Sequence, residues 1–137
     1  MDTHRYLLDT NILSHLIRNP FGPVFDRLKS ILPATACTSI IVSAEIRFGL
    51  RKGASKKLQI QAEKVLEAMA MDILPLEKPV DLHYGEIRAF LNQTGKPIGG
   101  NDLFIAAHAR ALDLTLVSAN VREFSRVPGL RVENWLE

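Results

Sequence analysis

The sequence has 137 residues, of which 47% are hydrophobic and 23% are charged. These proportions are ordinary for one soluble domain with a single hydrophobic core. The formal net charge of +2 is too small to indicate a nucleic-acid-binding protein by itself. The sequence shows no apolar signal region and no window as long as a membrane span, so we expect a cytoplasmic protein with no membrane contact. The single cysteine, Cys37, cannot form an internal disulfide and lies in an apolar run typical of a core.

The first predicted element is a short strand over residues 6–8, because these residues form an apolar run of strand length. Asp9, Thr10 and Asn11 follow, and all three favour caps and turns over strand interiors. A helical pattern begins at once and covers residues 12–17. Asp9 is therefore expected at the carboxyl edge of a sheet, where ligands bind in open α/β folds, although a plain helix cap would occupy the same position.

The remaining elements alternate between helical and strand patterns. Apolar residues spaced three and four apart predict helices over residues 24–31, 42–52, 56–71, 78–94 and 103–112. Short apolar runs predict strands over residues 36–41, 73–74, 114–118 and 130–135. Strands separated by helices favour parallel pairing with right-handed crossovers. The sequence therefore predicts a three-layer α/β/α sandwich, with a parallel sheet of about five strands, as one domain over residues 1–137.

Acidic residues follow several of the predicted strands. Asp9 follows the first strand, Glu45 lies in the helix after the second, and Asp102 opens a helix that is apolar on most sides. Asn120 and Glu123 follow the fourth strand. Each of these residues could be a cap if it stood alone. In a parallel sheet, however, the strand ends of one sense share an edge, so we expect these side chains to converge.

Converging carboxylates raise one another's pKa and resist ionising together, so such a cluster calls for a compensating cation. A site rich in oxygen ligands suits Mg²⁺ or Mn²⁺, whereas the histidines and the one cysteine are not placed to bind zinc. A metal of this kind can activate water and stabilise charge on a phosphodiester. The pattern therefore favours hydrolysis of nucleic acid. A basic run between residues 47 and 57 is either a phosphate-contact surface or a solvated face.

Four blocks of sequence, in this order, resemble the PIN-domain ribonucleases, and most closely the VapC toxins of bacterial toxin–antitoxin pairs. They are Leu-Leu-Asp-Thr-Asn at 7–11, Ser-Ile-Ile-Val-Ser-Ala-Glu-Ile-Arg-Phe-Gly at 39–49, Pro-Ile-Gly-Gly-Asn-Asp-Leu-Phe-Ile-Ala-Ala-His-Ala at 97–109 and Leu-Val-Ser-Ala-Asn-Val-Arg-Glu-Phe at 116–124. The resemblance implies a PIN fold and a type II toxin that cleaves RNA through metal-activated water, with Mg²⁺ or Mn²⁺ as cofactor. It also implies inhibition by a VapB-like antitoxin and a homodimer within a larger assembly. Toxins with a similar sequence include cleavers of initiator tRNA.

Position by position, the resemblance makes Asp9, Glu45 and Asp102 catalytic acids and assigns the metal to Asp9 and Asp102. The fourth acidic position stays open between Asn120, which stands where many members carry Asp, and Glu123.

Supporting roles fall on other residues. Thr10 and Asn11 would orient the first acid, and Ser118 keeps the hydroxyl of a frequent Thr. Val42 stands where the family often has Thr, which removes a plausible cap from the helix that carries Glu45. RNA contacts are expected at Arg47, Arg51 and Lys52.

Two alternatives compete with the ribonuclease. One is a PIN-like module without catalytic activity that binds RNA or a protein partner, which the three intact acids argue against. The other is aspartyl-phosphate chemistry at Asp9, which would want a second acid two residues on, where this chain has Asn11.

Overall fold

Five short strands form one parallel sheet in the computed structural model, which describes residues 3–32 and 34–136. The strands are β1 (Tyr6–Leu8), β2 (Ala36–Ser39), β3 (Asp72–Leu74), β4 (Thr115–Val117) and β5 (Val132–Glu133). Their order in the sheet is β3-β2-β1-β4-β5. The predicted parallel α/β/α architecture is therefore confirmed.

The centre of the sheet lies at β1, which pairs with β2 on one side and with β4 on the other. Leu8 at the end of β1 lies opposite Thr38 of β2 and Val117 of β4. The chain first moves outward from β1 to β3 and then crosses back to add β4 and β5. This reversal between β1 and β4 is the topological switch point where α/β sheets open a crevice for ligands.

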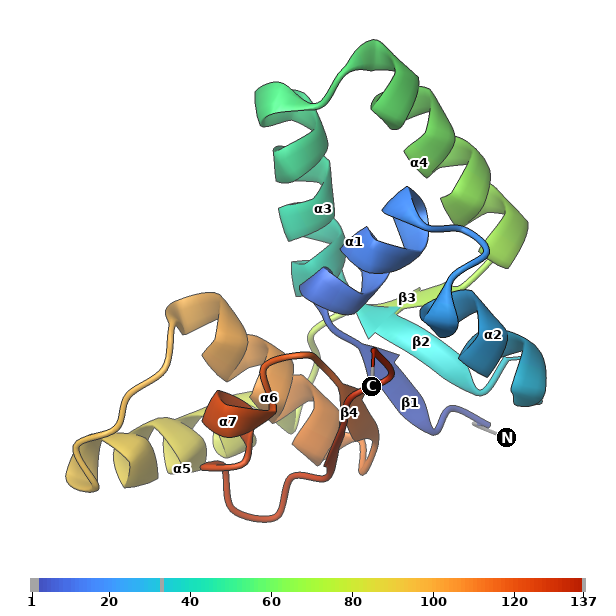
Figure 1. Cartoon of the computed structure of the whole chain (residues 1–137). Coiled ribbons are helices and arrows are strands. Elements are labelled where there is room, and N and C mark those ends of the chain that lie inside the picture. The colour runs from blue at the N-terminus through green and yellow to red at the C-terminus, as the bar shows by residue number, and fades with distance from the viewer. Residues whose placement is uncertain (1–2, 33, 137) are drawn as a thin grey trace.

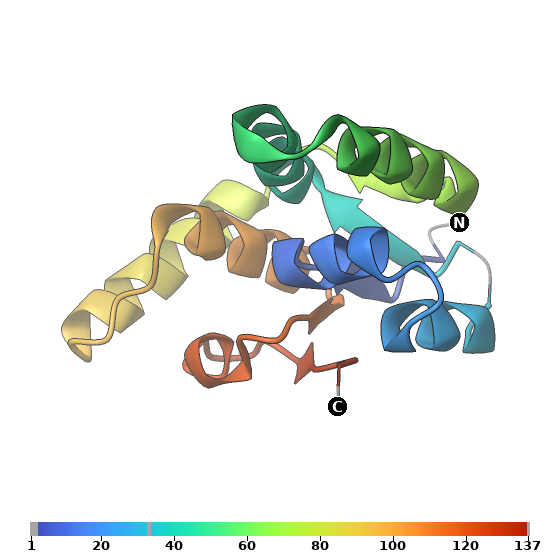
Figure 2. The same ribbon diagram turned by 45° about the horizontal axis from the view of Figure 1, so that its top comes forward.

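Helices cover both faces of the sheet (Figure 1). They are α1 (Thr10–Arg18), α2 (Pro23–Ser30), α3 (Ile40–Gly53), α4 (Lys56–Met69), α5 (Val80–Gln93), α6 (Gly100–Ala111) and α7 (Val121–Phe124). The first four lie together on one side and the last three on the other, as right-handed crossovers require when the direction of travel reverses. In Figure 2, α3 and α4 form a hairpin along the top of the molecule, and both helices pack against α1. No helix in the described ranges is long and apolar enough to cross a membrane.

The core is built from β1, β4 and the inner faces of α1 and α6. Leu7, Leu8 and Leu116 are completely buried, as is Cys37, which confirms its predicted place in the core. Helix α6 is enclosed from Ile105 to Ala109, as its apolar sequence predicted. The first acid and the helix that carries Asp102 are therefore held on the most rigid part of the molecule.

Several local features differ from the predictions. The last strand, expected over residues 130–135, covers only Val132–Glu133. The strand expected over residues 36–41 ends at Ser39, because the Ser39 hydroxyl accepts a hydrogen bond from the backbone N–H of Ile41 and caps α3. Ser39 therefore caps the helix that was expected to lose a cap because Val42 stands in place of Thr. Helix α6 begins earlier than expected, with Gly99 as its N-cap. Helix α7 has four residues, too few to show a periodic pattern in the sequence.

Candidate active site

Asp9 lies where β1 meets α1, and its side chain is 4% exposed. Its Oδ1 accepts a hydrogen bond from the backbone N–H of Thr10 at 2.7 Å, so it does cap the helix. Its Oδ2 accepts a second hydrogen bond, also 2.7 Å long, from the hydroxyl of Ser118 after β4. Burial raises the pKa of Asp9, and these two hydrogen bonds oppose the rise while the nearby charge of Glu45 adds to it. A cap alone would not need a carboxylate this deep in the switch-point crevice.

Glu45 comes to the site from the second turn of α3. Its Oε1 accepts a hydrogen bond from the hydroxyl of Thr10 at 2.5 Å. Its Oε2 lies 3.4 Å from the amide nitrogen of Asn101 in the first turn of α6. The carboxylate is therefore held between α1 and α6, next to both other predicted acids. Thr10 also spans two acids, because its N–H bonds to Asp9 and its hydroxyl to Glu45.

Asp102 lies in the first turn of α6, partly exposed at the edge of the crevice. Burial, together with the negative charges of Asp9, Glu45 and Glu123, raises the pKa of Asp102 to about 6. These four acids come from four separate segments of the chain. The structure therefore brings them close enough for their charges to act on one another, as the parallel sheet predicted.

The segment after β4 supplies the fourth side of the site. The Asn120 amide donates a hydrogen bond to Glu123 Oε2 at 2.8 Å, so the two candidates for the fourth acidic position lie side by side. The backbone N–H of Asn120 bonds to the Ser118 hydroxyl, which itself bonds to Asp9. Asn11 accepts a hydrogen bond from the backbone N–H of Ala119 at 3.2 Å and ties this segment to α1. Asn11 therefore positions the turn after β4.

The donor set suits a hard divalent cation, because carboxylates, hydroxyls and amides supply only oxygen ligands there. Within residues 3–32 and 34–136, however, no three His, Cys, Asp or Glu side chains lie close enough together to form a complete metal site. Carboxylates that share a site repel one another, so a cation bound there would offset that repulsion.

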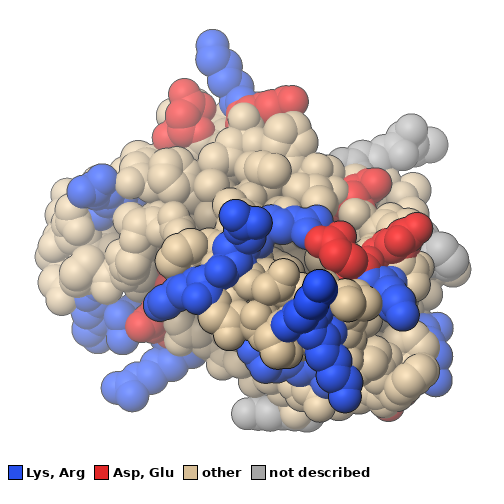
Figure 3. Space-filling model, turned by 90° about the horizontal axis from the view of Figure 1, so that it is seen from above, with Lys and Arg blue, Asp and Glu red and all other residues tan. Residues whose placement is uncertain are grey.

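The three predicted RNA-contact residues lie on the second half of α3 and are exposed. Figure 3 looks onto the end of the molecule where α3 meets α4, and Lys and Arg side chains lie across the middle of that face. Arg47 forms an ion pair with Glu63 of α4, so its charge is compensated locally. Lys52 lies over the ring of Phe48, 5.7 Å from its centre. Arg51 and Lys52 thus keep the character of a basic surface better than Arg47 does.

A groove of about 440 Å³ runs from Glu45 along the second half of α3 to the start of α4. Thr10 and Glu45 line one part of it, and Ser55 at the start of α4 lines another. Arg18, the last residue of α1, also lines the groove, although nothing in its spacing from the acids marked it in the sequence. The groove gives an extended ligand a path from the acidic crevice toward the α3–α4 hairpin.

Two further residues of this site were not singled out by the sequence. Asn101 lies in the first turn of α6, and its amide contacts Glu45. In the sequence, the only sign that Asn101 belongs to the site was its position immediately before Asp102. Ser39 caps the helix that carries Glu45, and its hydroxyl also lies 2.8 Å from Nδ1 of the buried His108 in α6. Burial lowers the pKa of His108, which therefore serves as a neutral link between α6 and α3.

Comparison with known proteins shows the class to which this fold and site belong. The PIN domain model matches residues 6–130. The chain therefore belongs to the PIN-domain family.

Individual relatives refine this assignment. Ribonuclease VapC2 of Rickettsia felis is 38% identical over 131 residues, which are 95% of this chain and 97% of that protein. The tRNA(fMet)-specific endonuclease VapC of Shigella flexneri is 35% identical over 133 residues, 96% of this chain and 98% of that protein. The crystal structure of VapBC2 from Rickettsia felis, bound to a promoter DNA fragment, superposes with a TM-score of 0.84 at 36% identity and covers 95% of this chain and 98% of that one. The predicted resemblance to VapC ribonucleases is confirmed.

Proposed function

We propose that this chain is a toxin endoribonuclease that uses Mg²⁺ or Mn²⁺ at the crevice formed by Asp9, Glu45, Asp102 and Glu123. The observation that supports this proposal best is the network of hydrogen bonds that holds acids from separate segments together: Thr10 bonds to both Asp9 and Glu45, and Ser118 bonds to Asp9. The raised pKa of Asp102, caused by burial and then by the charges of the other three acids, agrees with it. Acids from four segments would not be held against their own repulsion for capping alone. The VapC relatives, which are named as ribonucleases, support the same reaction.

We assign the metal to Asp9 and Asp102. When bound there, the ion would activate a water molecule and stabilise negative charge on the phosphodiester. Ser118 and the backbone of Thr10 hold Asp9, so its carboxylate keeps one orientation. Glu45 is held by the Thr10 hydroxyl on Oε1, and we assign Oε2 to accept a proton from the attacking water.

Glu123 completes the acidic site in this proposal, in preference to Asn120. Asn120 carries no charge, and its amide donates to Glu123, which orients that carboxylate. Glu123 also acts on the pKa of Asp102, which places its charge toward the crevice. Asn120 and Ser118 are therefore positioning residues for the acids.

The expected partner is a VapB-like antitoxin, and the structure of the Rickettsia felis VapBC2 pair supports this. We also propose that the toxin forms a homodimer within that assembly. The Shigella flexneri relative is named for cleavage of tRNA(fMet), which makes initiator tRNA the first substrate to test. Arg18 lines the groove that leads from Glu45, and Arg51 and Lys52 are exposed near the end of α3. These cations offer the RNA backbone a basic surface, so cleavage should weaken as salt rises.

The decisive experiment is cleavage of initiator tRNA by the purified chain with Mg²⁺, with Mn²⁺ and with chelator. Asp9→Asn keeps the size of the side chain and should lower the rate by at least about a hundredfold, because a metal-binding charge is lost. Glu67→Gln, which removes an exposed carboxylate on α4, is the matched control and should keep full activity. If the wild type leaves both tRNA and mRNA intact with either metal, the ribonuclease proposal fails.

Calorimetry separates the enzyme from an inert binding module. The wild type should release or absorb heat on binding Mg²⁺, and Asp102→Asn should abolish most of this signal. Equal heats from both proteins would favour the inert module.

A further inference from the structure

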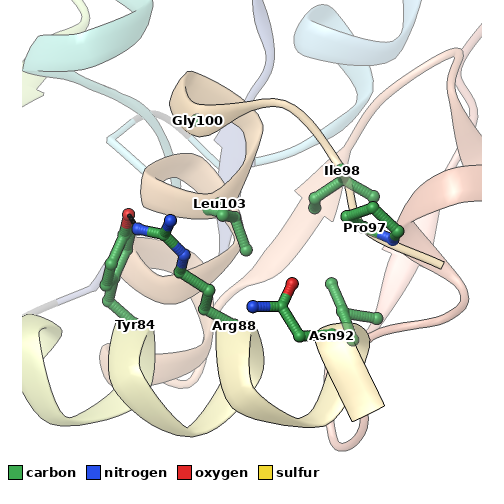
Figure 4. A pocket seen from close by; sticks show the side chains of 8 residues that line it. Tyr84, Arg88, Asn92, Pro97, Ile98, Gly100 and Leu103 are labelled. Carbon is green, nitrogen blue, oxygen red and sulfur yellow. Dashed lines mark hydrogen bonds between the residues drawn. The ribbon is translucent and has the colours of Figure 1, made fainter. Parts of the chain in front are cut away.

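A small pocket lies between α5 and α6, beside the turn of α6 that carries Asp102 (Figure 4). Its volume is about 180 Å³. Pockets for whole drug-sized ligands have volumes of about 300 Å³ or more, so this one has room for a single ring system. Gly100 lines the pocket and lies in the first turn of α6, the turn that also carries Asp102.

Most of the pocket wall is apolar. Leu91 of α5 and Leu103 of α6 line it and are buried, and Pro97 and Ile98 close it on another side. One amide enters this apolar space: Figure 4 shows the side chain of Asn92 pointing toward the gap between Leu103 and Pro97. An amide offers two donors and one acceptor, so it can bond to the edge of a planar polar ring.

Arg88 brings a guanidinium to the same pocket. Its Nη1 donates a hydrogen bond to the Tyr84 hydroxyl at 3.0 Å. The Tyr84 ring in turn stacks on Phe104 of α6, with 4.4 Å between ring centres. These contacts restrict the guanidinium, so it loses less conformational freedom when a ligand binds. One of its five N–H groups bonds to Tyr84, so the others can face a ligand.

We propose that this pocket binds one unpaired nucleobase of the RNA substrate, next to the phosphodiester that the acidic crevice holds. Proteins recognise unpaired bases by packing their faces against apolar, aromatic or guanidinium groups and by hydrogen bonds to their edges. The leucines, the Asn92 amide and the Arg88 guanidinium supply these contacts together. A phosphate group would use Arg88 but would gain nothing from the apolar walls. This inference rests on the proposed ribonuclease function.

The test uses hairpin RNAs with randomised loops, cleaved by the full-length chain with Mg²⁺ and sequenced at their new ends. The wild type should prefer one base at a loop position beside the cut. Arg88→Ala and Asn92→Ala should both lose this preference and should lower kcat/KM on the preferred loop about tenfold, because contacts to a base edge are lost. Arg131→Ala is the matched control: it removes an exposed arginine that pairs with Asp113 at the opposite edge of the sheet, and should keep the preference.

Several results would overturn the proposal. Unchanged base preference and rate in both pocket variants would do so directly. A change in molecular mass of the variants in solution would instead assign the pocket to a protein interface. If the wild type cleaves no RNA, the proposed function itself fails, and equilibrium binding of the same hairpins decides about the pocket. Equal affinity of the wild type and both variants would then refute base binding, whereas weaker binding by both would support it.

Discussion

Asp102 gives the sharpest test of the crowded acidic crevice, because its replacement should stabilise the fold. Its pKa is raised from 3.8 to about 6, so the folded state binds a proton more tightly than the unfolded state does. The ionised carboxylate is therefore unfavourable in the folded protein. The free-energy cost of ionising Asp102 in the folded protein is absent below the unfolded pKa near 3.8, grows as the pH rises, and reaches its full value above pH 6.

The size of the effect follows from the shift. About two pKa units correspond to about 3 kcal/mol, and solvent screening of this partly exposed group reduces that to about 1 to 2 kcal/mol. For a domain of this size, Asp102→Asn should raise the melting temperature by about 4 to 8 °C at pH 8 in chelator. The gain should shrink when the pH is lowered to 5.

The assay is thermal unfolding followed by circular dichroism at pH 8 and pH 5, in buffer with EDTA. Glu67→Gln serves as the control, because an exposed carboxylate on α4 should leave the melting temperature within about 2 °C at both pH values. If Asp102→Asn does not raise the melting temperature at pH 8, or raises it as much at pH 5, the argument from the raised pKa of Asp102 is refuted.

Three further outcomes are expected. Ser118→Ala should lower the free energy of unfolding by about 1 to 3 kcal/mol and lower the activity, because buried Asp9 loses a hydrogen bond. Ser118→Thr keeps the hydroxyl and should retain both the stability and the activity, and equal denaturant midpoints for the wild type and Ser118→Ala would contradict this. Mg²⁺ at a hundred times its dissociation constant should stabilise the wild type by about 2.7 kcal/mol, so a melting temperature that ignores both Mg²⁺ and chelator would count against a metal site. Ala70 ends α4 with φ of 47°, so Ala70→Gly should stabilise the protein by about 1 kcal/mol in urea unfolding, while Ala68→Gly inside the helix should destabilise it by about as much.

The sequence predicted the fold and the meeting of the acids because both follow from local signals and one topological rule. The run before Asp9 marks a strand, the residues after it mark a helix start, and alternation of strands with helices implies a parallel sheet. Strand ends in such a sheet share an edge, so acids far apart in the chain could be expected together. The catalytic roles given to these residues stay predictions.

What the sequence did not show depends on contacts between distant segments. The β-branched run at residues 40–42 has the composition of a strand, but Ser39 caps a helix there and His108 of α6 holds Ser39. The hydrogen bond from Thr10 to Glu45 joins residues 35 positions apart, and no periodicity reports such a pair. The same holds for Asn101, whose amide faces a carboxylate that only folding brings near.

The position of β4 inside the sheet has a consequence for the order in which the acidic site is assembled. Strand β4 lies between β1 and β5, yet it is nearly the last element to be synthesised. A chain still emerging from the ribosome lacks the Ser118 hydroxyl that holds the first acid, as well as Glu123. The proposed site is thus incomplete until almost every residue of the chain has been added.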